Sequence, residues 1–187
     1  YFAKYSKSKN TAMLIYNENL SVCPLTTHLP LKKVTKYITL KLIDQKVRLI
    51  DSFYRKNKKI KPKIAILGLN PHCETTDRFS EEEKIIIPTI KRLKKNNIDI
   101  TGPFSADTFF LKKNIKKYNV VVGHYHDQVL TPIKTLYEFD AINITLGLPY
   151  IRVSPDHGPN ENMVSKNKSN PLSLRKSIEF LVNLNEN

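Results

Sequence analysis

The chain has 187 residues, a hydrophobic share of 40% and a formal net charge of +14 at pH 7. This length and composition are sufficient for one packed globular domain, or a domain plus part of another. No apolar run is long enough to cross a membrane and no signal-peptide pattern is present, so we expect no membrane association. The two cysteines, Cys23 and Cys73, do not form a CxxC pair. Reduced thiols and a cytoplasmic location are therefore expected.

The positive charge raises the alternative of a nucleic-acid-binding module. Only six of the 31 basic residues are Arg, and the many Lys accompany many Asn and Ile, as AT-rich coding also produces. The Lys-rich stretches 55–63, 91–95 and 112–117 lie at predicted helix ends or turns and lack the interleaved aromatic residues that stack on bases. We therefore interpret the charge as a solvated surface and expect no nucleic-acid partner.

In chain order, the spacing of hydrophobic residues predicts strands alternating with helices. The strands are expected at 12–16, 20–25, 63–67, 120–123 and 141–145, with a further extended stretch at 150–153. The first helix is expected after an N-cap at Thr39, with apolar positions from Leu42 to Phe53, and ends in the Lys-rich turn before Pro62. The others are expected from a capping box at Ser80 to about residue 96, with a kink or restart at Pro88, at 107–115, at 130–139, and from Pro171 onward. Residues 160–170 are expected to form a polar loop.

This alternation predicts a layered α/β fold built on a parallel or mixed sheet. We expect residues 1–153 to form the α/β domain that binds metal and substrate, and residues 154–187 to form a separate C-terminal segment.

Polar side chains follow three of the predicted strands. Strand 120–123 ends at Gly123 and is followed by His126, Asp127 and Gln128, while His28 and His72 each follow another strand. Ligands of open α/β sheets bind beyond the carboxyl ends of the strands. If the strands are parallel neighbours, the three histidines could converge on a divalent metal and leave one position open for substrate. No compact ligand motif such as HExxH is present.

Other known signatures are missing from the sequence. It contains no GxGxxG, GxxxxGK[ST] or GxSxG motif, so neither catalytic nor cofactor-binding residues can be assigned. Lys134, Asn143 and Arg152 are suited to bind an anion, although for each residue alone an ordinary surface position is the better explanation. Together with the histidines they suggest a small, anionic, metal-chelating substrate.

Six short blocks of sequence identify a family resemblance. They are Thr26-Thr-His-Leu-Pro30, Gly68-Leu-Asn-Pro-His72, Gly102-Pro103 with Ala106-Asp-Thr108, Tyr125-His-Asp-Gln128, Asn143-Ile-Thr-Leu-Gly-Leu-Pro149 and Asp156-His-Gly158. In this order and spacing the chain resembles the 4-hydroxythreonine-4-phosphate dehydrogenase family of pyridoxal 5'-phosphate biosynthesis. The resemblance implies a fold similar to isocitrate and isopropylmalate dehydrogenases, which bind NAD without a dinucleotide fingerprint.

The resemblance also implies an oxidoreductase site. His28, His72 and His126 would bind a divalent metal (zinc, cobalt, nickel, manganese or magnesium), with one histidine supplied by the partner in a homodimer. Lys134, Asn143 and Arg152 would contact the phosphorylated substrate. NAD or NADP would accept hydride, and the resulting 3-oxo acid would lose carbon dioxide to give 3-amino-2-oxopropyl phosphate.

Some features depart from the family pattern. The loop after His72 reads Cys73-Glu-Thr-Thr-Asp in place of Ala-Gly-Glu and glycines, and Val129 replaces a glycine. A related substrate, such as threonate or erythronate phosphate, therefore remains open. The resemblance further implies that the chain corresponds to the C-terminal part of the enzyme, with the N-terminal domain largely missing, so an inactive remnant is another alternative. Because the family's last segment packs on that domain, we expect the helix from Pro171 to be poorly supported.

Overall fold

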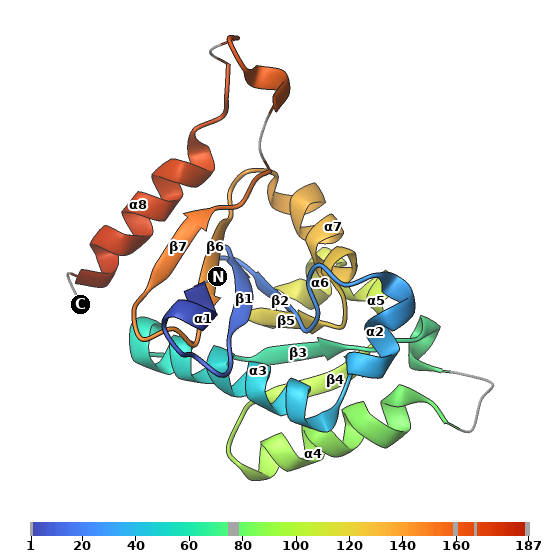
Figure 1. Ribbon diagram of the computed structural model, residues 1–187. Helices are drawn as coiled ribbons and strands as arrows, with labels where there is room; N and C mark the ends of the chain where they lie inside the picture. Colours follow the sequence, from blue (N-terminus) through green and yellow to red (C-terminus); the bar gives the residue numbers. More distant parts are fainter. Residues whose placement is uncertain (1, 75–78, 159–160, 167, 186–187) are drawn as a thin grey trace.

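The structure is a computed structural model that describes residues 2–74, 79–158, 161–166 and 168–185. A seven-stranded sheet with strand order β4-β3-β5-β2-β1-β6-β7 lies between two layers of helices (Figure 1). The strands are β1 (Ala12–Tyr16), β2 (Ser21–Pro24), β3 (Ile64–Leu67), β4 (Ile100–Phe104), β5 (Val120–Gly123), β6 (Ile142–Leu146) and β7 (Arg152–Pro155).

The helices differ in length and type. The α-helices are α1 (Phe2–Tyr5), α2 (Leu31–Tyr37), α3 (Leu40–Phe53), α4 (Ile87–Lys95), α5 (Ala106–Phe109), α6 (Lys112–Ile115), α7 (His126–Tyr137) and α8 (Leu172–Asn185). Two π-helical segments, η1 (Tyr54–Lys58) and η3 (Glu82–Ile86), and two 3-10 turns, η2 (Pro71–Cys73) and η4 (Glu161–Met163), complete the described elements.

The sheet is mixed, which confirms the α/β prediction. Strands β4, β3, β5 and β2 run parallel to one another, whereas β1, β6 and β7 join antiparallel. The short turn at 17–20 forces β1 and β2 into an antiparallel pair, because a parallel connection needs a long crossover. The parallel half therefore places the carboxyl ends of β2, β5 and β3 at one edge.

Each face of the sheet buries its own hydrophobic cluster. Ile64 and Ile66 point toward the layer of α3, α4 and α8, and Ala65 and Leu67 point toward the layer of α5, α6 and α7. This alternation follows from the two-residue period of a strand. Both faces of β3 and β5 are buried, as expected for strands that read as continuous apolar runs.

Several predicted helix boundaries are confirmed, and others are wrong. Thr39 accepts a hydrogen bond from the N–H of Leu42 at 3.1 Å, as an N-cap does. Ser80 caps the N–H of Glu83 at 3.2 Å. The predicted restart at Pro88 is confirmed: the π-helical η3 ends at Ile86, α4 begins at Ile87, and Pro88 lies in its first turn, where the missing N–H costs no helical hydrogen bond.

Helix α7 begins at His126, four residues earlier than the predicted start at Leu130. Residues 126–128 thus lie in the first turn of a helix and not in a loop. The segment 107–115 forms two short helices, α5 and α6, and helix α2 was not expected. Part of the predicted loop 160–170 is the turn η4, and residues 160 and 167 lie outside the described residues.

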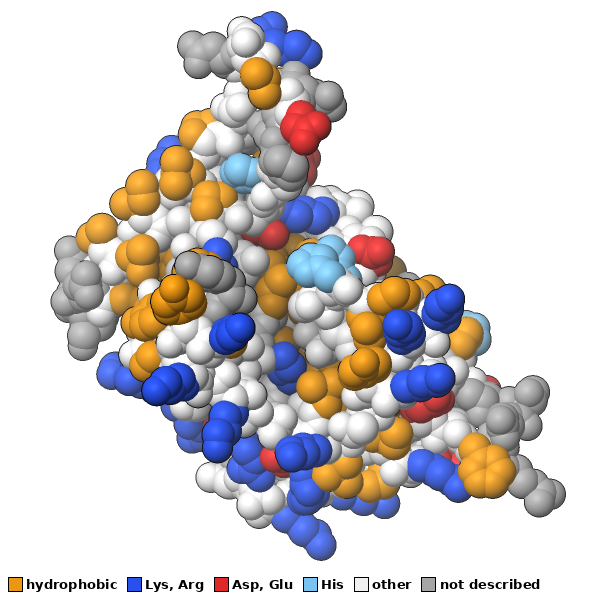
Figure 2. Space-filling model, viewed as in Figure 1, with side chains coloured by type: hydrophobic (Ala, Val, Ile, Leu, Met, Phe, Trp, Pro, Cys, Tyr) orange, Lys and Arg blue, Asp and Glu red, His pale blue; other side chains and the backbone are white. Residues whose placement is uncertain are grey.

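Helix α8 packs on the sheet through one face. Phe180 is buried against Tyr16, with ring centroids 5.1 Å apart, and against Phe53 at 6.3 Å. The buried Ser173 hydroxyl donates to the carbonyl of Ala141 at 2.5 Å. The helix is therefore attached to the domain, and its expected weak protection stays a prediction. Its outer face exposes apolar side chains, namely Leu174, Ile178, Leu181 and Val182, and Figure 2 shows apolar atoms along this helix. Among the described residues, no helix is long and apolar enough to cross a membrane.

Candidate functional site

The three candidate metal ligands follow the carboxyl ends of neighbouring parallel strands, as predicted. His28 lies between β2 and α2, His72 lies in the turn η2 after β3, and His126 is the first residue of α7 after β5. The structure nevertheless brings only two of them together.

His28 and His126 lie side by side in the lining of a pocket of about 400 Å³, to which Thr27, Leu29 and Tyr125 also contribute. Their ring centroids are 5.8 Å apart. Two imidazoles bound to one tetrahedral ion have centroids roughly 5 Å apart, given metal–nitrogen distances near 2 Å. The observed separation of 5.8 Å is close to that value.

A carboxylate orients the second histidine of this pair. His126 Nδ1 lies 2.8 Å from Asp127 Oδ1. Because the carboxylate can only accept, Nδ1 donates and Nε2 keeps the lone pair that binds a metal.

His72 lies apart from this pair, beside helix α5. Its Nδ1 is 3.4 Å from the hydroxyl of Ser105 and 3.7 Å from Asp107 Oδ2, and its side chain is 71% exposed. In the part of the chain that the structure describes, no group of three or more His, Cys, Asp or Glu side chains could hold a metal ion. One chain thus presents two adjacent imidazoles and a third that points into solvent elsewhere.

The neighbouring His124 has a different role. It is fully buried, and its Nε2 lies 2.8 Å from the carbonyl oxygen of Leu67. Burial lowers its pKa below the ordinary histidine value, although the carbonyl of Leu67 partly opposes this. The neutral His124 ring therefore donates a hydrogen bond from Nε2 to the Leu67 carbonyl, and this bond links the ends of β5 and β3.

A buried carboxylate, which the sequence did not single out, anchors the loop that carries His72. Glu82 Oε1 accepts the backbone N–H groups of Leu69 at 2.7 Å and Asn70 at 2.8 Å, and Oε2 accepts the Asn70 side-chain amide at 2.8 Å. Burial raises the pKa of Glu82, but these hydrogen bonds outweigh it and leave the pKa below its ordinary value. The three consecutive acids 81–83 read as a solvated first helical turn, so nothing in the sequence signalled this role.

The three predicted substrate residues share the sheet face that α7 covers. Asn143 pairs across the sheet with Ile15, which packs in the hydrophobic cluster under α7, so both side chains lie on that face. Thr145 is two residues after Asn143 and therefore lies on the same face, as does Arg152, which pairs with Thr145. Lys134 lies on α7 itself, eight residues after His126, or about 12 Å along the helix axis.

Each of these side chains has a distinct environment. Lys134 Nζ pairs with Asp156 Oδ2 at 2.7 Å and also donates to the Asp156 carbonyl. Arg152 donates to Thr145 Oγ1 at 3.2 Å and stacks over the Phe2 ring at 4.9 Å. The side-chain oxygen of Asn143 is buried and has no hydrogen-bond partner among the described residues. An orphaned acceptor of this kind is costly unless a ligand donor satisfies it.

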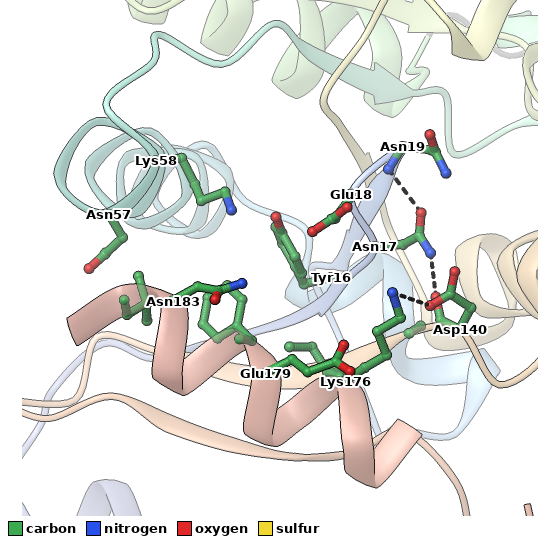
Figure 3. Close-up of a pocket in the computed structure, with 14 residues that line it drawn as sticks. Tyr16, Asn17, Glu18, Asn19, Asn57, Lys58, Asp140, Lys176, Glu179 and Asn183 are labelled. Atoms are coloured by element: carbon green, nitrogen blue, oxygen red, sulfur yellow. Dashed lines mark hydrogen bonds and ion pairs between the residues drawn. The ribbon is translucent and has the colours of Figure 1, made fainter. Parts of the chain in front are cut away.

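A second pocket, of about 130 Å³, lies at the opposite edge of the sheet, between the β1–β2 turn and α8. Figure 3 shows its polar lining, in which Lys58 points toward Tyr16 and Lys176 pairs with Asp140 at 3.7 Å. Its lining includes none of the candidate histidines or substrate residues. It is therefore separate from the candidate site.

The fold and these side chains define the class of protein: a layered α/β domain with two adjacent histidines after the carboxyl ends of parallel strands, and with lysine, arginine and asparagine side chains on α7 and on the sheet face that α7 covers. A sequence profile of the family described as "Pyridoxal phosphate biosynthetic protein PdxA" matches residues 1–181. The chain belongs to this family.

Two curated relatives with different names illustrate the similarity. The 4-hydroxythreonine-4-phosphate dehydrogenase of Sulfurihydrogenibium sp. is 44% identical over 184 residues, which are 97% of this chain and 56% of the relative. The D-threonate 4-phosphate dehydrogenase of Pectobacterium atrosepticum is 35% identical over 183 residues, again 97% of this chain and 56% of the relative. The chain thus spans about half the length of these relatives.

Solved structures also show similarity to the chain. The crystal structure of 4-hydroxythreonine-4-phosphate dehydrogenase from Klebsiella pneumoniae matches with a TM-score of 0.83 and 33% identity, covering 98% of this chain and 56% of that one. A terephthalate 1,2-cis-dihydrodiol dehydrogenase from Burkholderia xenovorans matches with a TM-score of 0.72 at 20% identity, over 92% of this chain and 55% of that one, which shows a shared fold alone.

Proposed function

We propose that the chain carries the metal- and substrate-binding part of a 4-hydroxythreonine-4-phosphate dehydrogenase of pyridoxal phosphate biosynthesis. The observation that carries the proposal is the contact between the rings of His28 and His126, 5.8 Å apart, together with Asn143 and Arg152 on the sheet face that α7 covers and Lys134 on α7 itself. The family match and the names of the relatives support it.

In this proposal His28 and His126 bind a divalent metal through neutral imidazole nitrogens. Asp127 keeps His126 in the tautomer that leaves Nε2 free. Since the described residues of one chain place His72 elsewhere, we propose that a second copy of the chain completes the site, as a homodimer with a shared active site. This arrangement would also explain the exposed position of His72.

Lys134 and Arg152 would bind the negatively charged groups of the substrate. Arg152 offers a fork of N–H donors that matches phosphate or carboxylate, and Lys134 offers a compact charge. The substrate would compete with Asp156 for Lys134, while Asp156 keeps this ammonium in place beforehand. The unpaired side-chain oxygen of Asn143 would accept a hydrogen bond from a hydroxyl or ammonium group of the substrate.

The proposed reaction oxidises the hydroxyl carbon of 4-phosphooxy-L-threonine to a ketone, and the 3-oxo acid then loses its carboxylate as carbon dioxide to form 3-amino-2-oxopropyl phosphate. NAD or NADP would accept the hydride and the hydroxyl proton would pass to solvent; His28 and His126 would hold a divalent metal, which would lower the pKa of the substrate hydroxyl.

D-threonate 4-phosphate is a second candidate substrate, since relatives with that name match at 34–35% identity. The two substrates differ at carbon 2, which carries an ammonium group in 4-phosphooxy-L-threonine and a hydroxyl group in D-threonate 4-phosphate. The altered loop that motivated this alternative includes residues 75–77, which lie outside the described residues.

The test combines native mass spectrometry with calorimetry. We expect the chain to take up zinc, and the His28→Ala and His126→Ala variants to lose it. His157→Ala, which removes an exposed histidine whose Nδ1 lies 3.0 Å from the Gly158 carbonyl oxygen, is the matched control and should behave as the parent. Equal zinc uptake by His126→Ala and His157→Ala would contradict the proposed site. Calorimetric titration of the zinc-loaded chain with each of the two phosphates then identifies the preferred substrate.

A further inference from the structure

The side chain of Gln128 joins two of the histidine-bearing segments. Its Oε1 accepts a hydrogen bond from the backbone N–H of His124 at 2.7 Å, and its Nε2 donates to the backbone carbonyl of Gly68 at 2.8 Å. Gly68 directly follows β3 and begins the loop that carries His72, whereas Gln128 lies two residues after His126 in α7. We call these two hydrogen bonds the Gln128 tie.

Further contacts extend the tie to the third histidine-bearing strand. The carbonyl oxygen of His124 accepts the hydroxyl of Thr26 at 2.7 Å and its backbone N–H at 3.2 Å. Thr26 lies two residues before His28. Hydrogen bonds therefore connect the carboxyl ends of β2, β5 and β3, and the side chain of Gln128 bonds α7 to the first residue of the loop that carries His72.

Packing at two glycines shows that the tie occupies a closely fitted position. A Cβ atom at Gly123 would lie 3.0 Å from Gln128 Oε1 and 2.5 Å from a methyl group of Val129. A Cβ atom at Gly68 would lie 2.6 Å from Cys73 Sγ and 3.2 Å from Glu82 Oε1. Neither glycine has a positive φ, so close approach, and not backbone conformation, accounts for the absence of a side chain at both positions.

We propose that Gln128 is a positioning residue, which sets the His72 loop relative to His126 without itself binding metal. The expected effect on metal binding rests on the proposed function. The two hydrogen bonds of the Gln128 tie do not depend on it. Glutamine is suited to this position because one planar amide both accepts and donates. Glutamate would face the Gly68 carbonyl with a second acceptor, and leucine would leave both backbone groups unpaired.

The first arm of the test measures amide exchange by mass spectrometry without metal. In Gln128→Leu and Gln128→Glu we expect residues 68–73 to exchange at least tenfold faster than in the parent. Tyr54→Phe is the matched control, because it removes a buried hydrogen bond to Ser21 Oγ (2.9 Å) at the opposite end of β2. This control should leave exchange in the loop unchanged. Parent-like exchange of residues 68–73 in Gln128→Leu would overturn the proposal.

The second arm measures zinc affinity of the same proteins and of His126→Ala. We expect Gln128→Leu to bind zinc about tenfold more weakly, the lower end of what supporting residues contribute at metal sites, and Tyr54→Phe to bind as the parent. If Gln128→Leu binds as tightly as the parent while His126→Ala does not bind, the positioning role is refuted and the metal site stands. If parent and His126→Ala bind equally, the metal part of the proposed function fails, and the exchange arm still decides whether the tie holds the loop.

Discussion

Replacing Glu82 with glutamine tests the reasoning about the loop that carries His72. The Glu82 side chain is 1% exposed, and its two oxygens accept hydrogen bonds from Leu69, from the Asn70 backbone and from the Asn70 side chain. Glutamine keeps one acceptor oxygen but turns an NH₂ group toward the Asn70 amide, which also donates. The variant therefore loses one charge-assisted hydrogen bond and weakens two others.

A hydrogen bond to a charged group contributes about 1.5–3 kcal/mol. We therefore expect Glu82→Gln to lower the free energy of unfolding by about 2 kcal/mol at neutral pH. The effect should depend on pH in a defined direction. The folded pKa of Glu82 lies below its ordinary value of 4.5, so its contribution is complete above that pH and is lost as pH falls through the folded pKa.

The assay is urea unfolding of parent and variant at about pH 7 and at several values below 4.5. The difference between the two proteins should be constant near neutrality and should shrink in acid. Glu83→Gln is the matched control, because Glu83 is an exposed acid in the same helical turn, and it should change stability little at any pH. A Glu82→Gln difference that is absent at neutral pH, or equally large in acid, would refute the assigned hydrogen bonds.

Three further predictions concern other parts of the molecule. Burial raises the pKa of Cys23 to about 12, so alkylation of the native protein at pH 8 should modify the partly exposed Cys73 first and reach Cys23 only on unfolding; equal rates would contradict this burial. Phe180→Ala removes the aromatic anchor of α8 and should cost about 3 kcal/mol in the attachment of that helix, seen as faster amide exchange in α8 with the central strands unchanged. Asp127→Asn removes the carboxylate that accepts from His126 Nδ1 and should weaken zinc binding about tenfold, whereas an unchanged affinity in calorimetry would show that Asp127 does not orient the ring.

Local patterns were sufficient for much of the fold. The apolar runs at 64–67 and 120–123 became β3 and β5, and the hydroxyls of Thr39 and Ser80 cap helices as predicted. These signals succeed because strand burial, helix periodicity and capping depend on residues a few positions apart. These signals did not predict the first turn of α7, because residues 126–128 lack the spacing of hydrophobic residues that indicates a helix. In that turn Gln128 bonds to Gly68, which is 60 residues away in the sequence.

In the candidate site, too, some features follow from the sequence and others only from the tertiary structure. The sequence by itself determined that His28, His72 and His126 each follow a strand, and parallel strands necessarily end at a common edge. Only the tertiary structure decided that His28 and His126 lie side by side while His72 turns toward Ser105 and Asp107. It also decided that Glu82, one of three consecutive acids, is the buried one. The physical reason is that strand order and side-chain direction depend on contacts between segments far apart in the chain, which no local pattern encodes.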